Sequence, residues 1–190
     1  MQKGKIMLEI LSKQYTGREE IAEEIPPEIT GYLEPILLPI LCMGKKIRRH
    51  VYENYDEGVI KDNVYGHIRR SIALAKALPL PEEIKTEVVK TLLLHDLPEV
   101  SVLTERRLDH DLTAPEKKAN PDLAEEVEKA ELQKAKEIFT TDELKLFDDF
   151  EDVGSFIKGK SEEKAVHPSA LIAYIIDKID ANILMAFPFF

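Results

Sequence analysis

No segment of this chain shows sustained alternation of apolar and polar residues with β-branched side chains, and this absence constrains the fold more than any other feature. Leucine, isoleucine, alanine, glutamate and lysine dominate the sequence, and only 8 of the 190 residues are glycine. Such a composition favours helices over strands and turns. The sequence therefore predicts an all-α fold.

Capping residues and prolines predict where the helices begin and end. The segment 29–48 should be kinked or broken at Pro35 and Pro39, because proline interrupts helical hydrogen bonding. The segments 97–114 and 154–163 are expected to be irregular. Helices are expected over about 3–14, from Thr16 to before Pro26, over 63–78 and 81–96, from Asn120 onward, from Asp142 to near Phe150, and from near Pro168 toward Pro188.

The chain has the length of one ordinary domain, which buries a full hydrophobic core without disulfides or a structural metal. No internal repeat, low-complexity tract or linker divides it. We therefore expect one domain over 1–190, in which residues 1–28 form an N-terminal helical extension and the core spans about 29–187.

Composition and charge restrict the location and the partners. The single cysteine, Cys42, forms no intramolecular disulfide, and the start of the chain lacks the apolar stretch of a secretory signal, so we expect a cytoplasmic location. The longest internal apolar run, 36–43, is far shorter than the roughly 20 residues that cross a bilayer. A formal net charge of −10 argues against general nucleic-acid binding, since it repels phosphate backbones.

Two polar residues end the helix expected over 81–96. His95 shares a helix face with Val88 and Leu92, so its side chain should point at the core. Asp96 follows directly, at a position where an unpaired carboxylate would be costly. The carboxylate therefore needs a buried partner.

Two more polar residues lie on apolar helix faces, His67 with Val64 and Asp177 with Ala173. Two imidazoles and two carboxylates satisfy one another when they share one divalent cation. This mixed set of nitrogen and oxygen donors suits Mn, Co, Ni, Fe, Mg or Zn. The predicted metal ligands are His67, His95, Asp96 and Asp177.

Each of these residues taken alone also has a simpler interpretation. The histidines His67 and His95 would be hydrogen-bonded core residues, and Asp177 would pair with a lysine or arginine. Asp180, one helical turn beyond Asp177, competes with it as a ligand. The other histidines are expected to be structural or solvated, namely His50, His110 and His167.

The order His67, His95-Asp96 and Asp177 resembles that of the HD superfamily of metal-dependent phosphohydrolases. VYGHIRRSIALAKAL resembles the first metal-ligand helix of that family, VVKTLLLHDLPEV the helix with the HD pair, and IIDKIDANI the last ligand helix. The likeness spans about residues 30–185 and is greatest to the small 5′-deoxynucleotidase-like members. It implies an HD-type helical bundle with one divalent ion between helices, and its spacing favours Asp177 over Asp180.

The resemblance also implies a catalytic role for Glu99, three residues after Asp96. The equivalent glutamate in the family activates or positions the attacking water, or protonates the leaving oxygen. The alternative is an exposed carboxylate that complements the dipole at the start of a new helix after Pro98.

The segment KKIRRH at 45–50 is the densest positive cluster of the chain. In the nucleotidase-like members an arginine upstream of the first histidine contacts the substrate phosphate, and Arg48 or Arg49 has roughly that place. Arg70, one turn from His67, ranks below Arg49 as a phosphate contact. The alternative is that these cations are solvated near the end of a helix.

The implied function is release of phosphate from a nucleoside 5′-monophosphate, with deoxy forms preferred, or from a similar phosphomonoester. Two segments depart from the nucleotidase pattern. Just before the first histidine, where the family often has polar or acidic residues, this chain has Asn63, Tyr65 and Gly66. After Glu99, the stretch SVLTERRLDHD has no clear copy of the aspartate segment that binds substrate. Glu105 or Asp109 would take the place of that aspartate. Alternatives are a nucleotide triphosphohydrolase or phosphodiesterase of the same superfamily, and a non-catalytic metal- or nucleotide-binding regulatory module.

The terminal segment ILMAFPFF is too apolar to lie in solvent. We expect it to pack into the core or against another subunit. Small HD proteins are often dimers, so the resemblance implies a homodimer.

Overall fold

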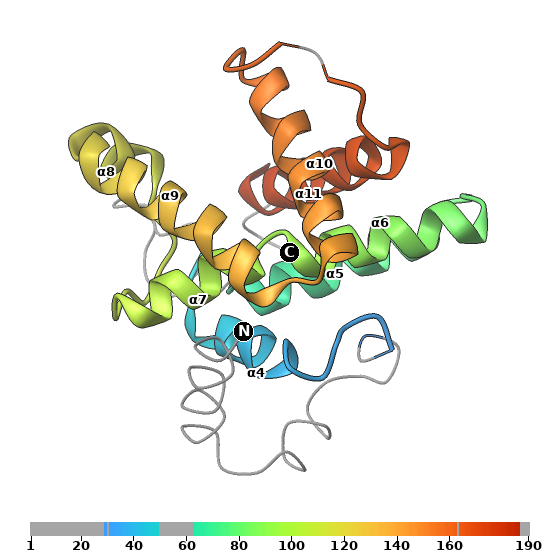
Figure 1. Cartoon of the computed structure of the whole chain (residues 1–190), viewed down its shortest axis with the longest axis horizontal. Coiled ribbons are helices and arrows are strands. Elements are labelled where there is room, and N and C mark those ends of the chain that lie inside the picture. Colours follow the sequence, from blue (N-terminus) through green and yellow to red (C-terminus); the bar gives the residue numbers. More distant parts are fainter. Residues whose placement is uncertain (1–28, 30, 50–62, 163, 187–190) are drawn as a thin grey trace.

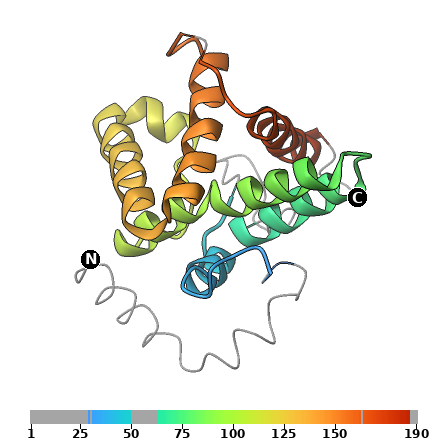
Figure 2. The same ribbon diagram turned by 45° about the vertical axis from the view of Figure 1, so that its right-hand side comes forward.

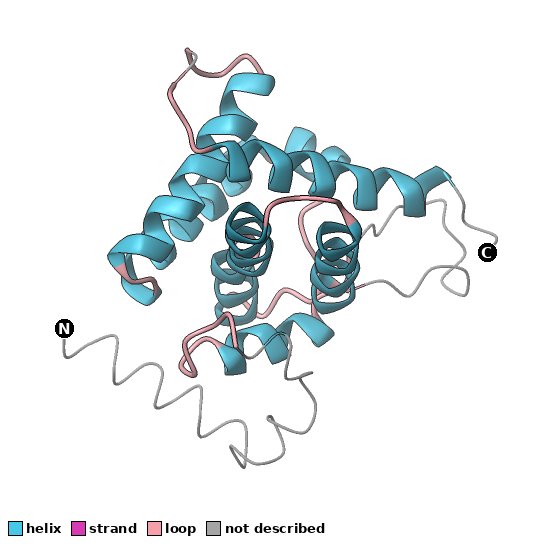
Figure 3. Cartoon of the chain, turned by 90° about the vertical axis from the view of Figure 1, so that its right-hand side faces the viewer, coloured by secondary structure: helices cyan, strands magenta, loops and turns pink. Residues whose placement is uncertain are grey.

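The computed structural model describes residues 29, 31–49, 63–162 and 164–186. Within these residues every regular element is a helix, which confirms the all-α prediction (Figure 3). Two isolated β-bridges join Arg48 to Asn63 and to His110.

Figure 1 shows the described helices, coloured in the order of the chain. They are α4 (Leu38–Met43), a 3₁₀ turn (Gly44–Lys46), α5 (Val64–Ala77), α6 (Glu82–Leu94), α7 (Leu97–Glu105), α8 (Ala114–Ala119), α9 (Pro121–Ile138), α10 (Thr141–Ile157) and α11 (Pro168–Ala186).

Most of the expected boundaries agree with the structure. The side-chain oxygen of Asn63 accepts a hydrogen bond from the Gly66 backbone N–H at 2.8 Å and begins α5. Asn120 caps α9 in the same way. Pro39 lies in the first turn of the short helix α4, so the segment 29–48 is broken as predicted.

Two predicted loops are wrong in part. The segment 97–114 contains α7, because Pro98 lies in the first helical turn, where its missing N–H is not needed. Helix α10 continues past Phe150 to Ile157 and includes Gly154. A Cβ atom at Gly154 would lie 3.1 Å from Cε2 of Tyr174, so glycine allows α10 to approach α11 closely.

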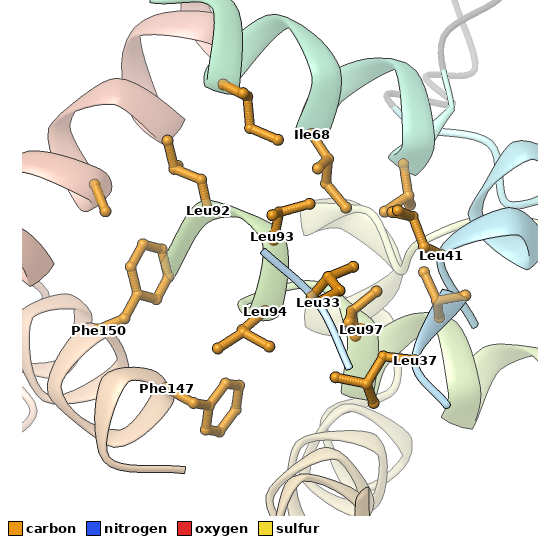
Figure 4. Packing of buried hydrophobic residues seen from close by; sticks show 14 of the residues in the cluster. Leu33, Leu37, Leu41, Ile68, Leu92, Leu93, Leu94, Leu97, Phe147 and Phe150 are labelled. Carbon is orange, nitrogen blue, oxygen red and sulfur yellow. The ribbon is translucent and has the colours of Figure 1, made fainter. Parts of the chain in front are cut away.

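Helices α5 and α6 pack against each other, and α11 packs against both (Figures 1 and 2). Helix α10 contacts α6 and α11, while α7 packs against α4 and α9. The core lies where these helices meet, around the fully buried run Leu92–Leu94 of α6 (Figure 4). The end of this run leads directly to His95 and Asp96, so the core packing fixes the position of both residues.

Several expectations lie outside the described residues: the helices over 3–14 and after Thr16, the extension 1–28, His50, and the end of the apolar segment 183–190. No described helix combines the length and the apolar character that a membrane crossing requires.

Candidate metal centre

The four predicted metal ligands come from three helices and the junction between two of them. His67 lies in α5, Asp177 lies in α11, and His95 with Asp96 connects α6 to α7. All four are buried, and the His67 side chain has no exposed surface. Because α5, α6 and α11 pack together, their polar residues meet inside the bundle.

Donor atoms of the four residues face one another at short distances. One ligand atom each of His67, His95 and Asp96 lies within 4.8 Å of the other two, as a shared metal ion requires. Asp177 Oδ1 lies 2.8 Å from Nε2 of His67 and 3.5 Å from Nε2 of His95. Asp96 Oδ1 lies 3.2 Å from Nε2 of His95. The four predicted residues therefore form one cluster.

The outer ring nitrogens set the orientation of both imidazoles. Nδ1 of His67 donates to Asp180 Oδ2 at 2.7 Å, and Nδ1 of His95 donates to the Leu92 carbonyl at 2.9 Å. With the proton on Nδ1, the lone pair of each neutral ring lies on Nε2 and points into the cluster.

Both Nε2 atoms are buried and make no hydrogen bond. Carboxylate oxygens lie close to both Nε2 atoms but form no hydrogen bond with them. This arrangement is expected of side chains that share one ion. Buried polar atoms without partners are costly, and hydrogen-bonded core histidines would not leave them. The donor set therefore fits a divalent cation better than the simpler interpretation.

The carboxylates of Asp177 and Asp180 contact different nitrogens of His67. Asp177 turns Oδ1 to the histidines, while its Oδ2 accepts a hydrogen bond from Lys178 Nζ at 2.6 Å. Asp180 contacts only the outer nitrogen of His67 and binds the Arg70 guanidinium at 2.9 and 3.0 Å. The geometry thus favours Asp177 as the ligand and Asp180 as its support for His67.

The close contacts within the cluster shift the pKa values of its members. Burial alone would raise the pKa of Asp96, but His95 and Arg49 hold it below its ordinary value. Burial opposes ionisation of Asp177 too, yet the two adjacent histidines place its pKa far below the usual range. Burial disfavours protonated His67, whose pKa is nevertheless raised by Asp177 and Asp180. Both aspartates are therefore ionised, as metal ligands must be.

A cleft of about 470 Å³ opens beside the cluster. Its wall includes three of the predicted ligands, His95, Asp96 and Asp177, together with Glu99. The Glu99 side chain is partly buried, and burial together with the charges of Asp96 and Glu131 raises its pKa well above the ordinary value. Glu99 thus lies beside the ligands and is not an exposed helix-end carboxylate.

The three predicted phosphate contacts lie in different places. Arg49 lines the cleft and donates from Nη1 to Asp96 Oδ2 at 2.7 Å. Arg48 does not line the cleft, and its guanidinium pairs with exposed Asp109 at 2.7 Å. Backbone hydrogen bonds from Arg48 to Asp109 and from Asp111 to Arg48 hold it beside the segment 109–111. Arg70 binds Asp180 behind His67. Only Arg49 is therefore placed to reach a ligand in the cleft.

The proposed substitutes for the missing aspartate segment do not line the cleft. Glu105 pairs with Lys134 at 2.8 Å, and Asp109 pairs with Arg48. Asp111, from the same stretch of chain, lines the cleft instead. The remaining described histidines are structural, since His110 binds Asp109 and Glu116, and His167 binds Ser169.

Sequence reasoning missed most of the other charged residues of the cleft, among them Lys178, Glu131 and Glu151. Glu131 lies four residues after Val127, on the apolar face of α9, and Glu151 lies four residues after buried Phe147. The test that identified Asp177 would have identified both glutamates. Lys178 follows Asp177 without any distinguishing pattern.

Comparison with known proteins finds no family model, curated protein or solved structure that matches this chain. What the site does must therefore be argued from its own geometry.

Proposed function

We propose that this chain is an HD-type metal-dependent phosphohydrolase that releases phosphate from a nucleoside 5′-monophosphate or a similar phosphomonoester. One observation carries the proposal: the Nε2 atoms of His67 and His95 lie buried without hydrogen bonds among the carboxylates of Asp96 and Asp177, beside an open cleft.

His67, His95, Asp96 and Asp177 would hold the ion, and their nitrogen and oxygen donors suit Mn, Co, Ni, Fe, Mg or Zn. When bound, a divalent ion supplies a Lewis acid for a phosphate oxygen and lowers the pKa of water. The buried ligand set, with His67 held by the hydrogen bond that it donates to Asp180, would fix the position of that charge beside the cleft.

Glu99 would move the proton of the reaction. It lines the cleft with Asp96, three residues away, and it makes no ion pair with any described residue, so its carboxyl group is available to a ligand. In this position it would take a proton from the attacking water or give one to the leaving oxygen. Burial and the charges of Asp96 and Glu131 raise its pKa, which makes the carboxylate a stronger base.

Arg49 and Lys178 would neutralise the phosphate. Each holds one carboxylate of the cluster, Arg49 through Asp96 and Lys178 through Asp177, and both line the cleft. The buried Nε of Arg49 has no hydrogen-bond partner, so this guanidinium retains a donor for a phosphate oxygen. Two cations beside the cluster match the charge of one terminal phosphoryl group.

The cleft gives little support to the triphosphohydrolase alternative. Three more lysines line it, Lys117, Lys158 and Lys160, but so do four carboxylates besides Glu99 and the ligands. Those carboxylates are Asp111, Glu128, Glu131 and Glu151. They would repel the additional charges of a polyphosphate.

The test is phosphate release from matched nucleoside mono-, di- and triphosphates, ribo and deoxy, with Mn, Co or Mg present. We expect monophosphates to be hydrolysed fastest, with deoxy forms ahead of ribo forms. The His95→Ala variant, purified in the same way, controls for a contaminating phosphatase. Faster release of intact triphosphate from triphosphates would overturn the monoester assignment, and no metal-dependent turnover of any ester would overturn the enzymatic one.

A further inference from the structure

Two carboxylates line the same cleft as the metal cluster without any counter-charge bound to them. Glu131 of α9 and Glu151 of α10 are partly buried, and neither forms an ion pair or hydrogen bond with a described residue. The neighbouring Glu128 differs, since it is exposed and lies 3.9 Å from Lys160. Besides Glu99, the pair Glu131 and Glu151 is therefore an unpaired acidic part of the cleft wall.

Burial makes it costly in free energy to ionise two carboxylates that have no positive partner. Burial and the charge of Glu151 together raise the pKa of Glu131 to about 7, against the opposing effect of Lys117. Burial raises the pKa of Glu151 as well, against the effect of Lys158. A positive group between the two carboxylates would offset the cost of ionising both.

A second metal ion does not fit these carboxylates. Within the part of the chain that the structure describes, the only set of three imidazole or carboxylate donors close enough to share an ion is His67, His95 and Asp96. Glu131 and Glu151 therefore do not belong to a three-donor ion site, and a partner that needs only carboxylate acceptors suits them better. A protonated amine attached to an organic group is such a partner, and it donates several hydrogen bonds to carboxylates.

A second observation shows that the same cleft also has a buried side-chain atom that needs a ligand. Nε2 of His95, whose side chain is 4% exposed, has no hydrogen-bond partner and belongs to the same cleft. The cleft thus combines a cluster that would hold a metal ion and its anion with two carboxylates that have no ion pair.

We infer that the cleft selects phosphomonoesters whose organic part carries a protonated amine, which Glu131 and Glu151 bind while Arg49 and Lys178 face the phosphate. This inference rests on the proposed phosphohydrolase function and names its substrate class. Glu131 and Glu151 are specificity residues here, and they take no part in the transfer of the phosphoryl group.

The experiment measures binding as well as turnover. Dissociation constants of ω-aminoalkyl phosphates with two to six carbons are determined by calorimetry and compared with those of the matched ω-hydroxyalkyl phosphates. The protein is the full chain with Mn²⁺ present, at about pH 8, where Glu131 is ionised and the amine is still protonated. We expect the best amine ester to bind at least about tenfold more tightly than its hydroxyl counterpart, as one charged hydrogen-bonded contact provides.

The variants Glu131→Gln and Glu151→Gln should each weaken this preference, and the double variant should abolish it. Glu125→Gln makes the same chemical change on an exposed position of α9 and should leave the preference intact. The helical circular dichroism and the metal content of each variant report whether the fold is retained.

Three outcomes separate the two proposals. Preferential binding of the amine esters without turnover would support this inference and overturn the hydrolase proposal. Equal binding of amine and hydroxyl esters, or a preference that survives in the double variant, would overturn this inference even if both esters are hydrolysed. Failure of every ester to bind would overturn it too.

Discussion

Asp180 Oδ2 lies 2.7 Å from Nδ1 of His67, on the side of the imidazole opposite Nε2, which faces Asp177. Arg70 holds the same carboxylate from the far side, so three residues of α5 and α11 form one buried chain of hydrogen bonds. Asp180 therefore determines which nitrogen of His67 is available to a metal ion.

Replacing Asp180 tests this support. The Asp180→Ala variant should bind metal about 10- to 100-fold more weakly, because His67 loses the acceptor that fixes its ring and its tautomer. Asp180→Asn keeps an acceptor oxygen and should recover much of the affinity. Metal titration followed by calorimetry measures both. Equal losses in the two variants would show that the carboxylate acts through its charge and not through its position.

Replacing Glu99 separates catalysis from metal binding. Glu99→Gln should keep near-normal metal content but lower turnover by roughly two orders of magnitude or more, as expected when a general acid or base is lost. Elemental analysis and phosphate release are measured on the same preparation. Wild-type turnover in this variant would remove Glu99 from the reaction.

His110 should make the stability of the protein depend on pH. Hydrogen bonds to Asp109 and Glu116 raise the pKa of His110, and the reciprocal contact lowers the pKa of Glu116 to about 2. A raised histidine pKa contributes stability that is fully present below the unfolded value of about 6.5 and is lost as pH rises through the folded value. His110→Gln should therefore cost up to about 1 kcal/mol at about pH 6 and less at about pH 9. Urea unfolding at both pH values measures this, and a cost that does not change with pH would contradict it.

The core beneath the ligands should be sensitive to cavities. Leu93 has no exposed surface and lies between Leu92 and Leu94, in the buried run that leads to His95. Leu93→Ala should therefore destabilise the fold by about 2–5 kcal/mol. Leu132→Ala, at a position that is 39% exposed, should change stability by less than about 0.5 kcal/mol. Thermal or urea unfolding of the two variants compares them, and similar losses would place Leu93 outside the core.

The sequence was sufficient to predict the cluster because its pattern is local. A histidine or aspartate at an apolar position of a helix stands out without knowledge of the tertiary structure, and His67, His95 and Asp177 each did so. Their meeting point followed from the packing of apolar faces, which α5, α6 and α11 share. The helix boundaries that depend on caps were also predictable, as Asn63 and Asn120 illustrate.

The surroundings of the cluster could not be predicted in the same way. Arg48 and Arg49 are neighbours in sequence, yet backbone bonds between residue 48 and the segment 109–111 turn one side chain to Asp109 and leave the other facing Asp96. Helix α7 was missed because Pro98 suggests a break and only the tertiary packing shows a new start. Both features depend on contacts between segments far apart in the chain.

The central claim is that His67, His95, Asp96 and Asp177 hold one divalent ion, and the metal content of the purified protein tests it most directly. Elemental analysis should find about one equivalent of a divalent transition metal or Mg per chain in the wild type, or after loading and dialysis. His95→Ala and Asp96→Ala should reduce this content to background, while Asp109→Ala, outside the cleft, should leave it unchanged. Undiminished metal in both ligand variants would contradict the account.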